Sequence, residues 1–285
     1  MSTPYLNIHL DKIAHNARTI VDLCAGHGIK VTGVTKGVCG HPEVAGAMLQ
    51  GGVNSIGDSR LINIARLQRA GIAADFMMLR TPALSRVGDV VAAVSVSLTS
   101  ELGVMSGLGR EAQRFGRPHD VVVMVDLGDL REGVRPDELL PFVREAVRLP
   151  GIAVKGLGAN LACFAGVTPS ETNMQRFVEL AIAVEADCGI TLEWLSAVNS
   201  SGLELIAAGQ MPSRVNHARV GEAILLGRET IHRHPWPGTH QDAFVLHAEV
   251  LECRRKPSMP NGQRTEDAFG ATPEFDDRGD RLRAL

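Results

Sequence analysis

The sequence predicts an α/β fold, a closed (β/α)8 barrel of the TIM type, and three observations support this prediction. From Val31 onward, short β-branched segments bounded by turn residues alternate with amphipathic segments of helical length, which is typical of βαβ units and a parallel sheet. About eight such rounds can be counted, more than the roughly five or six strands of most open doubly wound sheets. The length of 285 residues also suits a barrel, which can take up about 250 residues as one unit.

The predicted elements follow one another in a regular order. An amphipathic helix over residues 11–24 precedes the first barrel strand. The strands cover residues 31–36, 54–57, 76–80, 94–99, 121–126, 154–160, 194–199 and 220–226. Between them, helices begin near Pro42, Ser59, Ala83, Ser100, Pro136, Ser170 and Gly202, several of them at residues that suit helix N-termini.

A second pattern begins near Asp242. Residues 244–252 read as a strand, and Pro and Gly punctuation with no further helical period follows them. We therefore expect residues 1–241 to form the barrel with an N-terminal lead-in segment, and residues 242–285 to begin a C-terminal β domain. Because the sequence stops before a third or fourth strand, this domain is either very small or cut short.

Composition narrows the class of function. With 29 basic and 32 acidic residues the net charge is −3, so no excess of positive charge exists to neutralise a nucleic acid. The apolar stretches fall far below the roughly 20 residues that cross a bilayer, and the N-terminus carries no export signal. Five widely spaced cysteines without a C-x-x-C pair fit a reducing cytoplasm. We expect a cytoplasmic protein with no nucleic-acid or membrane partner.

The end of the first barrel strand carries a candidate catalytic lysine. Catalytic groups in such barrels come from the carboxyl ends of the strands and the loops after them. Lys36 follows Val31-Thr-Gly-Val-Thr, where apolar surroundings would lower the pKa of its amine and make it nucleophilic. The alternative is a lysine that ends the strand and reaches solvent.

The last two strands offer groups for a phosphate. Asn199, Ser200 and Ser201 follow the seventh strand, and Gly221 lies in the eighth region. Hydroxyl groups and glycines near helix N-termini after strands seven and eight suit phosphate binding. The alternative is that the two serines only cap the next helix. Arg219 lies beside the same site, with an interior ion pair to a carboxylate such as Glu222 as its alternative role.

Together these motifs resemble the alanine racemase family of pyridoxal-phosphate enzymes, also called fold type III, over nearly the whole chain. Within the family, the sequence looks most like the ornithine racemase branch. The resemblance rests on Val31-Thr-Gly-Val-Thr-Lys36, Asp126-Leu-Gly-Asp-Leu-Arg131-Glu-Gly, Gly156-Leu-Gly-Ala-Asn160, Asn199-Ser-Ser-Gly202, Arg219-Val-Gly-Glu-Ala-Ile224, Leu226-Gly-Arg-Glu-Thr230 and Lys256-Pro-Ser-Met-Pro260.

This resemblance implies that pyridoxal 5'-phosphate is the cofactor. Lys36 would hold it as an internal aldimine and act as one of two bases, while Arg219 would face the pyridine nitrogen. A permanently charged guanidinium there keeps the ring nitrogen unprotonated and the ring a weaker electron sink.

The resemblance also assigns the other cofactor-binding residues. Asn199 with Ser200 or Ser201, and the backbone amides around Gly221 and Glu222, would hold the phosphate. Arg131 would lie near the phenolic oxygen and the substrate carboxylate, and Asn160 and Cys163 would lie beside the ring.

The second base departs from the family pattern. Family racemases use a tyrosine from the partner subunit, whereas the only tyrosine here is Tyr5. The second base is therefore Cys163, a histidine, a residue missing from a shortened C-terminus, or absent. Cys163 is chemically capable if its pKa is lowered, and a buried structural cysteine is the alternative.

Other candidate residues have simpler interpretations. His232, His234 and His240 suggest a metal site, but the prolines and glycine among them favour a solvated loop between domains, so we expect no metal. Asp58 is interpreted as a helix cap.

The predicted function is an amino-acid racemase with a small-molecule amino-acid substrate, and ornithine or another basic amino acid is the candidate. Asp126, Asp129 and Glu132 are candidates to pair with a distal ammonium. We expect a homodimer, because a partner's β domain closes the barrel mouth in the family. The alternatives are a non-catalytic pyridoxal-phosphate carrier or homeostasis protein, which would not need residues 242–285, and a decarboxylase or D-amino-acid aldolase on the same barrel.

Overall fold

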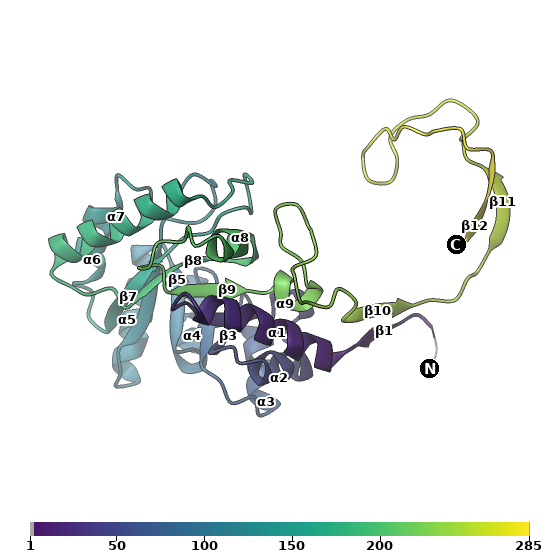
Figure 1. Ribbon diagram of the computed structural model, residues 1–285. Coiled ribbons are helices and arrows are strands. Elements are labelled where there is room, and N and C mark those ends of the chain that lie inside the picture. Colours follow the sequence, from purple (N-terminus) through teal and green to yellow (C-terminus); the bar gives the residue numbers. More distant parts are fainter. Residues whose placement is uncertain (1–2, 285) are drawn as a thin grey trace. The chain divides into compact units, whose positions relative to one another are not determined.

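The computed structural model describes residues 3–284 and divides them into two compact units (Figure 1). The larger unit covers His9–Ala243. The smaller unit combines residues 3–8 with residues 244–284, so the two ends of the chain belong to one unit. The second unit begins close to the expected residue 242, whereas residues 3–8, expected to lead into the barrel, group with the smaller unit.

The larger unit is a closed barrel of parallel strands, as predicted. Strand β2 pairs with both β3 and β9, and this pairing closes the ring. Thr32 in β2 lies opposite Arg219 in β9, so the residues that follow these strands emerge at the same mouth. The strands are β2 (Lys30–Val34), β3 (Ser55–Asp58), β4 (Phe76–Met78), β5 (Val96–Thr99), β6 (His119–Met124), β7 (Ile152–Gly158), β8 (Trp194–Val198) and β9 (His217–Val220).

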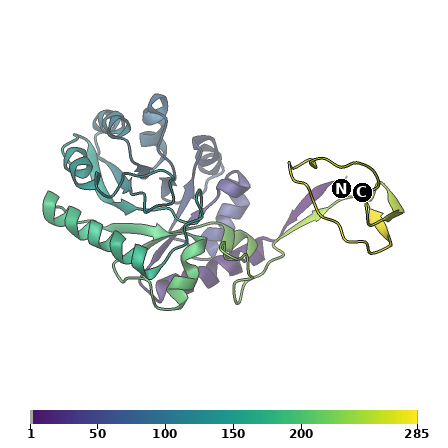
Figure 2. The ribbon, with the colours of Figure 1, turned by 90° about the horizontal axis from the view of Figure 1, so that it is seen from above.

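Helices surround the strands on the outside of the barrel (Figure 2). Their buried faces follow the sequence: in α1, for example, Ile13, Ala17 and Ile20 are fully buried at helical spacing. Ser170 begins α7 with a capping box, as its position predicts. The α-helices are α1 (Leu10–Ala25), α2 (Pro42–Gln50), α3 (Leu61–Arg69), α4 (Val87–Ala93), α5 (Leu102–Arg114), α6 (Leu139–Ala146), α7 (Glu171–Cys188), α8 (Leu203–Ala207) and α9 (Glu222–Leu226), with short 3-10 turns η1 (Lys36–Val38), η2 (Leu84–Arg86) and η3 (Ser200–Gly202).

Apolar side chains fill one half of the barrel interior and polar ones the other. Met77, Leu98, Val122 and Met124 form one buried cluster from neighbouring strands. Such a packed interior rules out a pore and leaves the mouth as the place for a ligand. On the opposite strands, Thr32, Ser196, His217 and Arg219 are all buried polar residues.

The last predicted strand is wrong in its position. Residues 220–226 were expected to be a strand, but β9 ends at Val220 and Glu222–Leu226 forms the short helix α9. A short apolar run is compatible with either a buried strand or a buried helix, so periodicity cannot distinguish them.

The smaller unit is built from two antiparallel strand pairs. β1 (Tyr5–Ile8) pairs with β10 (Phe244–His247), and the rings of Tyr5 and His247 stack at 4.6 Å between centroids. β11 (Cys253–Pro257) pairs with β12 (Asp280–Ala284). The strand expected over residues 244–252 therefore ends earlier, at His247. This strand-rich unit agrees with the predicted C-terminal β region.

A search of the described residues for membrane-spanning segments finds no helix that is both long and apolar enough.

Two buried histidines predict a loss of stability in mild acid. Burial, with Arg219 and then Lys30 adding to it, lowers the pKa of His217 to about 3, and burial together with Arg117 lowers that of His119 to about 4. In the unfolded chain both rings have the ordinary pKa of 6.5 and become protonated as the pH falls below it, whereas in the folded protein they stay neutral. The free energy of unfolding therefore decreases as the pH falls. From pH 7 to pH 5 each ring should cost about 2 kcal/mol of unfolding free energy, measured by urea denaturation.

The variant His119→Gln should lose about half of this pH dependence, and the control His27→Gln, at an exposed position, should retain it. An unfolding free energy that is the same at both pH values in the original protein would contradict the burial of neutral rings.

Candidate active site

One cavity lies at the barrel mouth, where the segments after six of the strands converge. It has a volume of about 230 Å³. Most of the residues singled out in the sequence line it. The lining residues are Val34, Lys36, Leu79, Arg131, Asn160, Ala162, Cys163, Asn199, Ser200, Arg219, Gly221, Glu222, Thr230 and Arg233.

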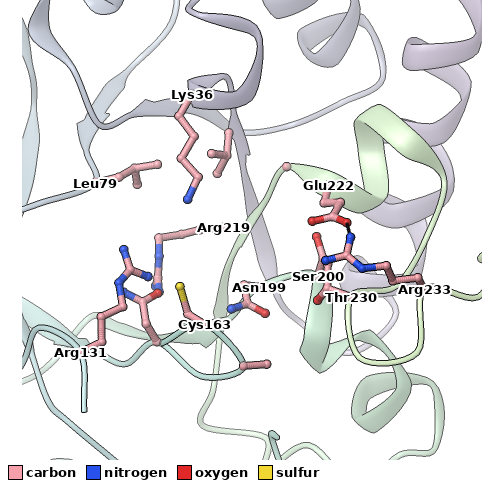
Figure 3. A pocket seen from close by; sticks show the side chains of 14 residues that line it. Lys36, Leu79, Arg131, Cys163, Asn199, Ser200, Arg219, Glu222, Thr230 and Arg233 are labelled. Atoms are coloured by element: carbon pink, nitrogen blue, oxygen red, sulfur yellow. Dashed lines mark hydrogen bonds and ion pairs between the residues drawn. The ribbon is translucent and has the colours of Figure 1, made fainter. Parts of the chain in front are cut away.

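Lys36 and Cys163 face one another across this cavity. Their side chains come from opposite sides and point toward each other (Figure 3). Lys36 lies in η1 directly after β2, and its amine forms no hydrogen bond or ion pair with the part of the chain that the structure describes. Both residues are exposed. The apolar burial expected for Lys36 and the buried structural role considered for Cys163 are therefore wrong, because both residues lie beyond their strands at the open mouth.

Arg219 supplies a buried positive charge at the base of the cavity. Its side chain is 6% exposed and donates to the carbonyl oxygens of Ser196 at 2.6 Å and Ala159 at 2.8 Å, and to Oδ1 of Asn160 at 2.8 Å. Burial lowers its pKa to about 10, with Glu132 opposing the shift and Arg131 adding to it. The guanidinium is therefore still cationic at neutral pH. No bond joins it to Glu222, so the considered ion pair between these two residues is wrong.

A chain of hydroxyl groups and a histidine supports Arg219 from below. The Arg219 guanidinium donates to the Ser196 hydroxyl, which lies 2.6 Å from Nδ1 of His217. Because that hydroxyl accepts from the guanidinium, it is free to donate to Nδ1. His217 is then protonated on Nε2, which lies 2.9 Å from the hydroxyl of Thr32. A neutral ring at this place adds no second charge beside Arg219.

Glu132 connects the two arginines of the site. Its carboxylate pairs with Nε of Arg131 at 2.7 Å and accepts from Nδ2 of Asn160 at 2.5 Å, while Asn160 accepts from Arg219. Gly133 allows the tight return of this loop, because its φ is +148° and an added Cβ would lie 2.4 Å from the nitrogen of Asp126. Arg131 is thereby held at the cavity wall.

Asp129 fixes the loop that carries Cys163. This side chain is fully buried, and its oxygens accept from the backbone nitrogens of Cys163, Phe164 and Val167 at 3.2, 2.8 and 2.9 Å. Burial would raise the pKa of Asp129, but these backbone donors outweigh it and hold the pKa below its usual value.

The two serines after β8 have different environments. Ser200 lines the cavity, and its hydroxyl accepts from the nitrogen of Ala223 at 3.1 Å. The Ser201 hydroxyl donates to Oδ1 of Asn199 at 2.5 Å and does not line the cavity. The side chain that caps this turn is Asn199, so the alternative in which the serines cap the next helix is wrong.

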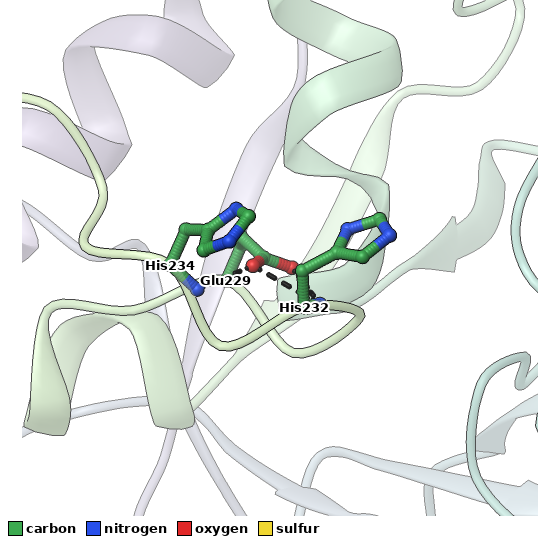
Figure 4. A group of neighbouring side chains, drawn as sticks. All are labelled: Glu229, His232 and His234. Carbon is green, nitrogen blue, oxygen red and sulfur yellow. Dashed lines mark hydrogen bonds between the residues drawn. The ribbon is translucent and has the colours of Figure 1, made fainter.

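A loop after α9 reaches the cavity and was missed in the sequence. Thr230 and Arg233 line the cavity, although this region was interpreted as a solvated connection between domains. The only signal in the sequence was the motif Leu226-Gly-Arg-Glu-Thr230, which contributed to the family resemblance but was assigned no role at the site. Glu229, 2% exposed, organises the loop by accepting from the nitrogens of Ile231, His232 and His234 (Figure 4).

The same loop brings together potential metal ligands. Ligand atoms of Glu229, His232 and His234 lie within 4.8 Å of one another, and His240 does not join them. Instead, His240 packs against His15 in an edge-to-face contact. Both oxygens of Glu229 already accept two backbone hydrogen bonds each, which favours a role in shaping the loop.

The three carboxylates considered for a distal ammonium are occupied elsewhere. Asp126 accepts from the nitrogens of Gly128 and Leu130, Asp129 is buried, and Glu132 pairs with Arg131. None of them lines the cavity.

Asp58 closes the first turn after β3. The helix-cap interpretation of Asp58 is wrong, because the N-cap of α3 is Arg60 and no described side chain caps that helix. Asp58 instead accepts from the nitrogen of Arg60 at 3.0 Å and from Nδ2 of Asn63 at 2.9 Å. It also accepts from the hydroxyl of Thr35 at 2.8 Å, and so fixes the residue before Lys36.

A closed barrel with an amine and a buried guanidinium at its mouth is an arrangement typical of an enzyme active site, and comparisons with known proteins identify the family. Residues 8–229 match the family described as alanine racemase, N-terminal domain. The chain therefore belongs to the alanine racemase family, and the resemblance noted in the sequence is confirmed.

Three similar proteins illustrate this relationship. The chain is 35% identical to an ornithine racemase of Acetoanaerobium sticklandii, over 99% of the chain and 80% of the relative, and 33% identical to a lysine racemase of Thermotoga maritima, over 100% and 80%. The alanine racemase of Streptomyces lavendulae shares the fold, with a TM-score of 0.75 and 18% identity over 100% of the chain and 73% of that structure.

Replacing Asp129 tests its role as the anchor of the Cys163 loop. In Asp129→Asn one of the two accepting oxygens is replaced by an amide nitrogen, which cannot accept a hydrogen bond from the backbone. This change should lower the free energy of unfolding by about 1–3 kcal/mol. Hydrogen exchange at residues 163–167 should also become faster. The control Asp137→Asn removes an exposed carboxylate paired with Arg135 and should change neither measurement appreciably. Unchanged exchange in Asp129→Asn would contradict the anchoring role.

Proposed function

We propose that this protein is a pyridoxal-phosphate-dependent racemase that interconverts the L- and D-forms of a basic amino acid such as ornithine or lysine. The observation that carries the proposal is the opposition of Lys36 and Cys163 across a cavity that also exposes Arg219. Relatives at 35% and 33% identity that are ornithine and lysine racemases support the substrate class.

The residues at the cavity fit pyridoxal phosphate. Lys36 offers a primary amine without a competing partner among the described residues, for covalent attachment of the cofactor. Arg219 offers a fixed cationic donor to the ring nitrogen, and Asn160 and Cys163 would lie beside the ring. Ser200, Asn199 and the backbone at Gly221 and Glu222 would hold the phosphate, with Ser201 supporting Asn199.

The chain's own groups then divide the work of racemisation. When bound, the cofactor makes the α-hydrogen of an attached amino acid more acidic. Lys36 Nζ would take or return the proton on one face of the α-carbon, and Cys163 Sγ would do so on the other. Arg131 would bind the substrate carboxylate, held in place by Glu132. Arg219 keeps its proton and would donate a hydrogen bond to the cofactor's ring nitrogen without protonating it.

We also propose a cytoplasmic homodimer. The described cysteines Cys24, Cys39, Cys163, Cys188 and Cys253 are all free, which suits a reducing compartment. The barrel mouth leaves Lys36 and Cys163 exposed, and a second subunit would exclude water from it.

A racemisation assay separates this proposal from a pyridoxal-phosphate carrier. The protein loaded with pyridoxal phosphate is incubated with pure L- or D-ornithine, lysine or alanine, and the enantiomers are separated by chiral chromatography. We expect both directions to proceed with a basic amino acid. A protein that binds the cofactor and racemises none of the three would be a carrier.

The variant Lys36→Ala should lose at least about a hundredfold in rate, because both the attachment point and one base are removed. Lys155→Ala is the matched control, since Lys155 lies in the middle of β7, outside the cavity, in a partly exposed ion pair with Glu193. It should racemise at the rate of the original protein.

A further inference from the structure

One acidic side chain lines the cavity among the described residues, and it is Glu222. The other charged residues in the lining are all cationic: Lys36, Arg131, Arg219 and Arg233. A cavity with four cations and one anion suits a phosphate and a carboxylate. The side-chain ammonium of a basic amino acid is repelled by the four cations and attracted only by the one anion. A basic amino acid that enters this cavity therefore needs Glu222.

Glu222 already has a partner of the required charge. Its Oε1 accepts from the Arg233 guanidinium at 2.7 Å. The two side chains are 33% and 70% exposed, respectively. An ion pair this exposed contributes about 0–1 kcal/mol, so another cation can replace the guanidinium at little cost.

The loop geometry explains why Arg233 occupies this place. The nitrogens of His232 and His234, on either side of Arg233, both donate to the buried carboxylate of Glu229 (Figure 4). The carbonyl oxygen of Arg233 accepts from the Arg228 guanidinium at 2.9 Å. Arg233 is thereby held at φ +59°, a left-handed conformation that non-glycine residues adopt only when their surroundings impose it. The backbone is fixed at this position, while the long side chain keeps its freedom to leave Glu222.

The three carboxylates suggested by the sequence cannot bind the distal ammonium of a substrate. Asp129 is fully buried beneath the Cys163 loop, and Asp126 closes its own turn. Glu132 is already bound to Arg131 and Asn160. Its removal to serve a substrate would leave Arg131 without its carboxylate partner and Asn160 without its acceptor.

We infer that the Glu222 carboxylate receives the distal ammonium of a basic amino acid and so selects the substrate, with Arg233 as its counter-ion until the substrate binds. This inference rests on the proposed racemase function and names the group that gives it its substrate class. The backbone nitrogen of Glu222 has a separate task at the phosphate, which a change of side chain leaves in place.

The test compares substrates with and without the distal ammonium in the variant Glu222→Gln. Lysine is compared with norleucine, and ornithine with norvaline, which keep the carbon chain and lack the charge. We expect kcat/KM for the basic member of each pair to fall about tenfold to a hundredfold relative to the neutral member. Arg233→Gln should lower the KM for lysine, because it frees Glu222. Glu204→Gln, at an exposed glutamate outside the cavity, should leave the ratio unchanged.

A binding measurement gives a second readout. The pyridoxal-phosphate affinity of Glu222→Gln, followed by visible absorbance, shows whether the cofactor site is intact. In the intact site, the dissociation constant of lysine should rise by the same factor as kcat/KM falls, while that of norleucine should not.

The possible failures are distinguishable. Absence of racemisation of every amino acid by the original protein would overturn the proposed function. Racemisation of lysine with the same lysine-to-norleucine ratio in the original protein and in Glu222→Gln would overturn the role of Glu222 alone. A preference of the original protein for norleucine would also overturn it.

Discussion

The buried guanidinium of Arg219 is the constraint around which the barrel mouth is organised. A charge removed from water costs several kcal/mol unless fixed partners replace the lost hydration. Here the carbonyl oxygens of Ser196 and Ala159 and the side chain of Asn160 replace it, and these groups come from β8 and from the segment that follows β7. Although burial lowers the pKa of Arg219 to about 10, this value lies well above neutral pH, so the group is still a cation there. His217, which reaches the same network through Ser196, stays neutral and avoids a second buried charge.

The other charges of the site are consequences of this one. Glu132 partly compensates Arg219 from a distance and orients Arg131 directly, so one carboxylate serves both arginines. The cavity lining nevertheless carries an excess of positive charge, which matches an anionic cofactor and the carboxylate of an amino acid. A cationic lining is a difficult environment for a basic amino acid. The position of Glu222 on the opposite side of the cavity from Arg131 gives the site two ends with different charge preferences (Figure 3).

The sequence was sufficient for the barrel and for the residues that directly follow its strands, because both depend on local patterns. Hydrophobic periodicity and turn residues mark the strands, and Lys36 and Asn199 were singled out by their places at the ends of predicted strands. Asn160 came from the family resemblance, and Arg219 lies inside β9 although the strand was expected to begin after it. The contribution of Arg233 could not be predicted, since it depends on three backbone nitrogens turning toward Glu229, which has no periodic signature. The exposure of Lys36 was missed for a related reason: β2 ends two residues earlier, and η1 carries the amine out of the apolar interior.

The proposed function requires that Lys36 alone, among the lysines of the chain, holds the cofactor at the barrel mouth. The most direct measurement is borohydride reduction of the protein loaded with pyridoxal phosphate, which fixes the cofactor to the amine that carries it, followed by peptide mapping. We expect a single labelled peptide that contains Lys36. A label on Lys12, Lys30, Lys155 or Lys256, or a reduced protein without any label, would contradict it.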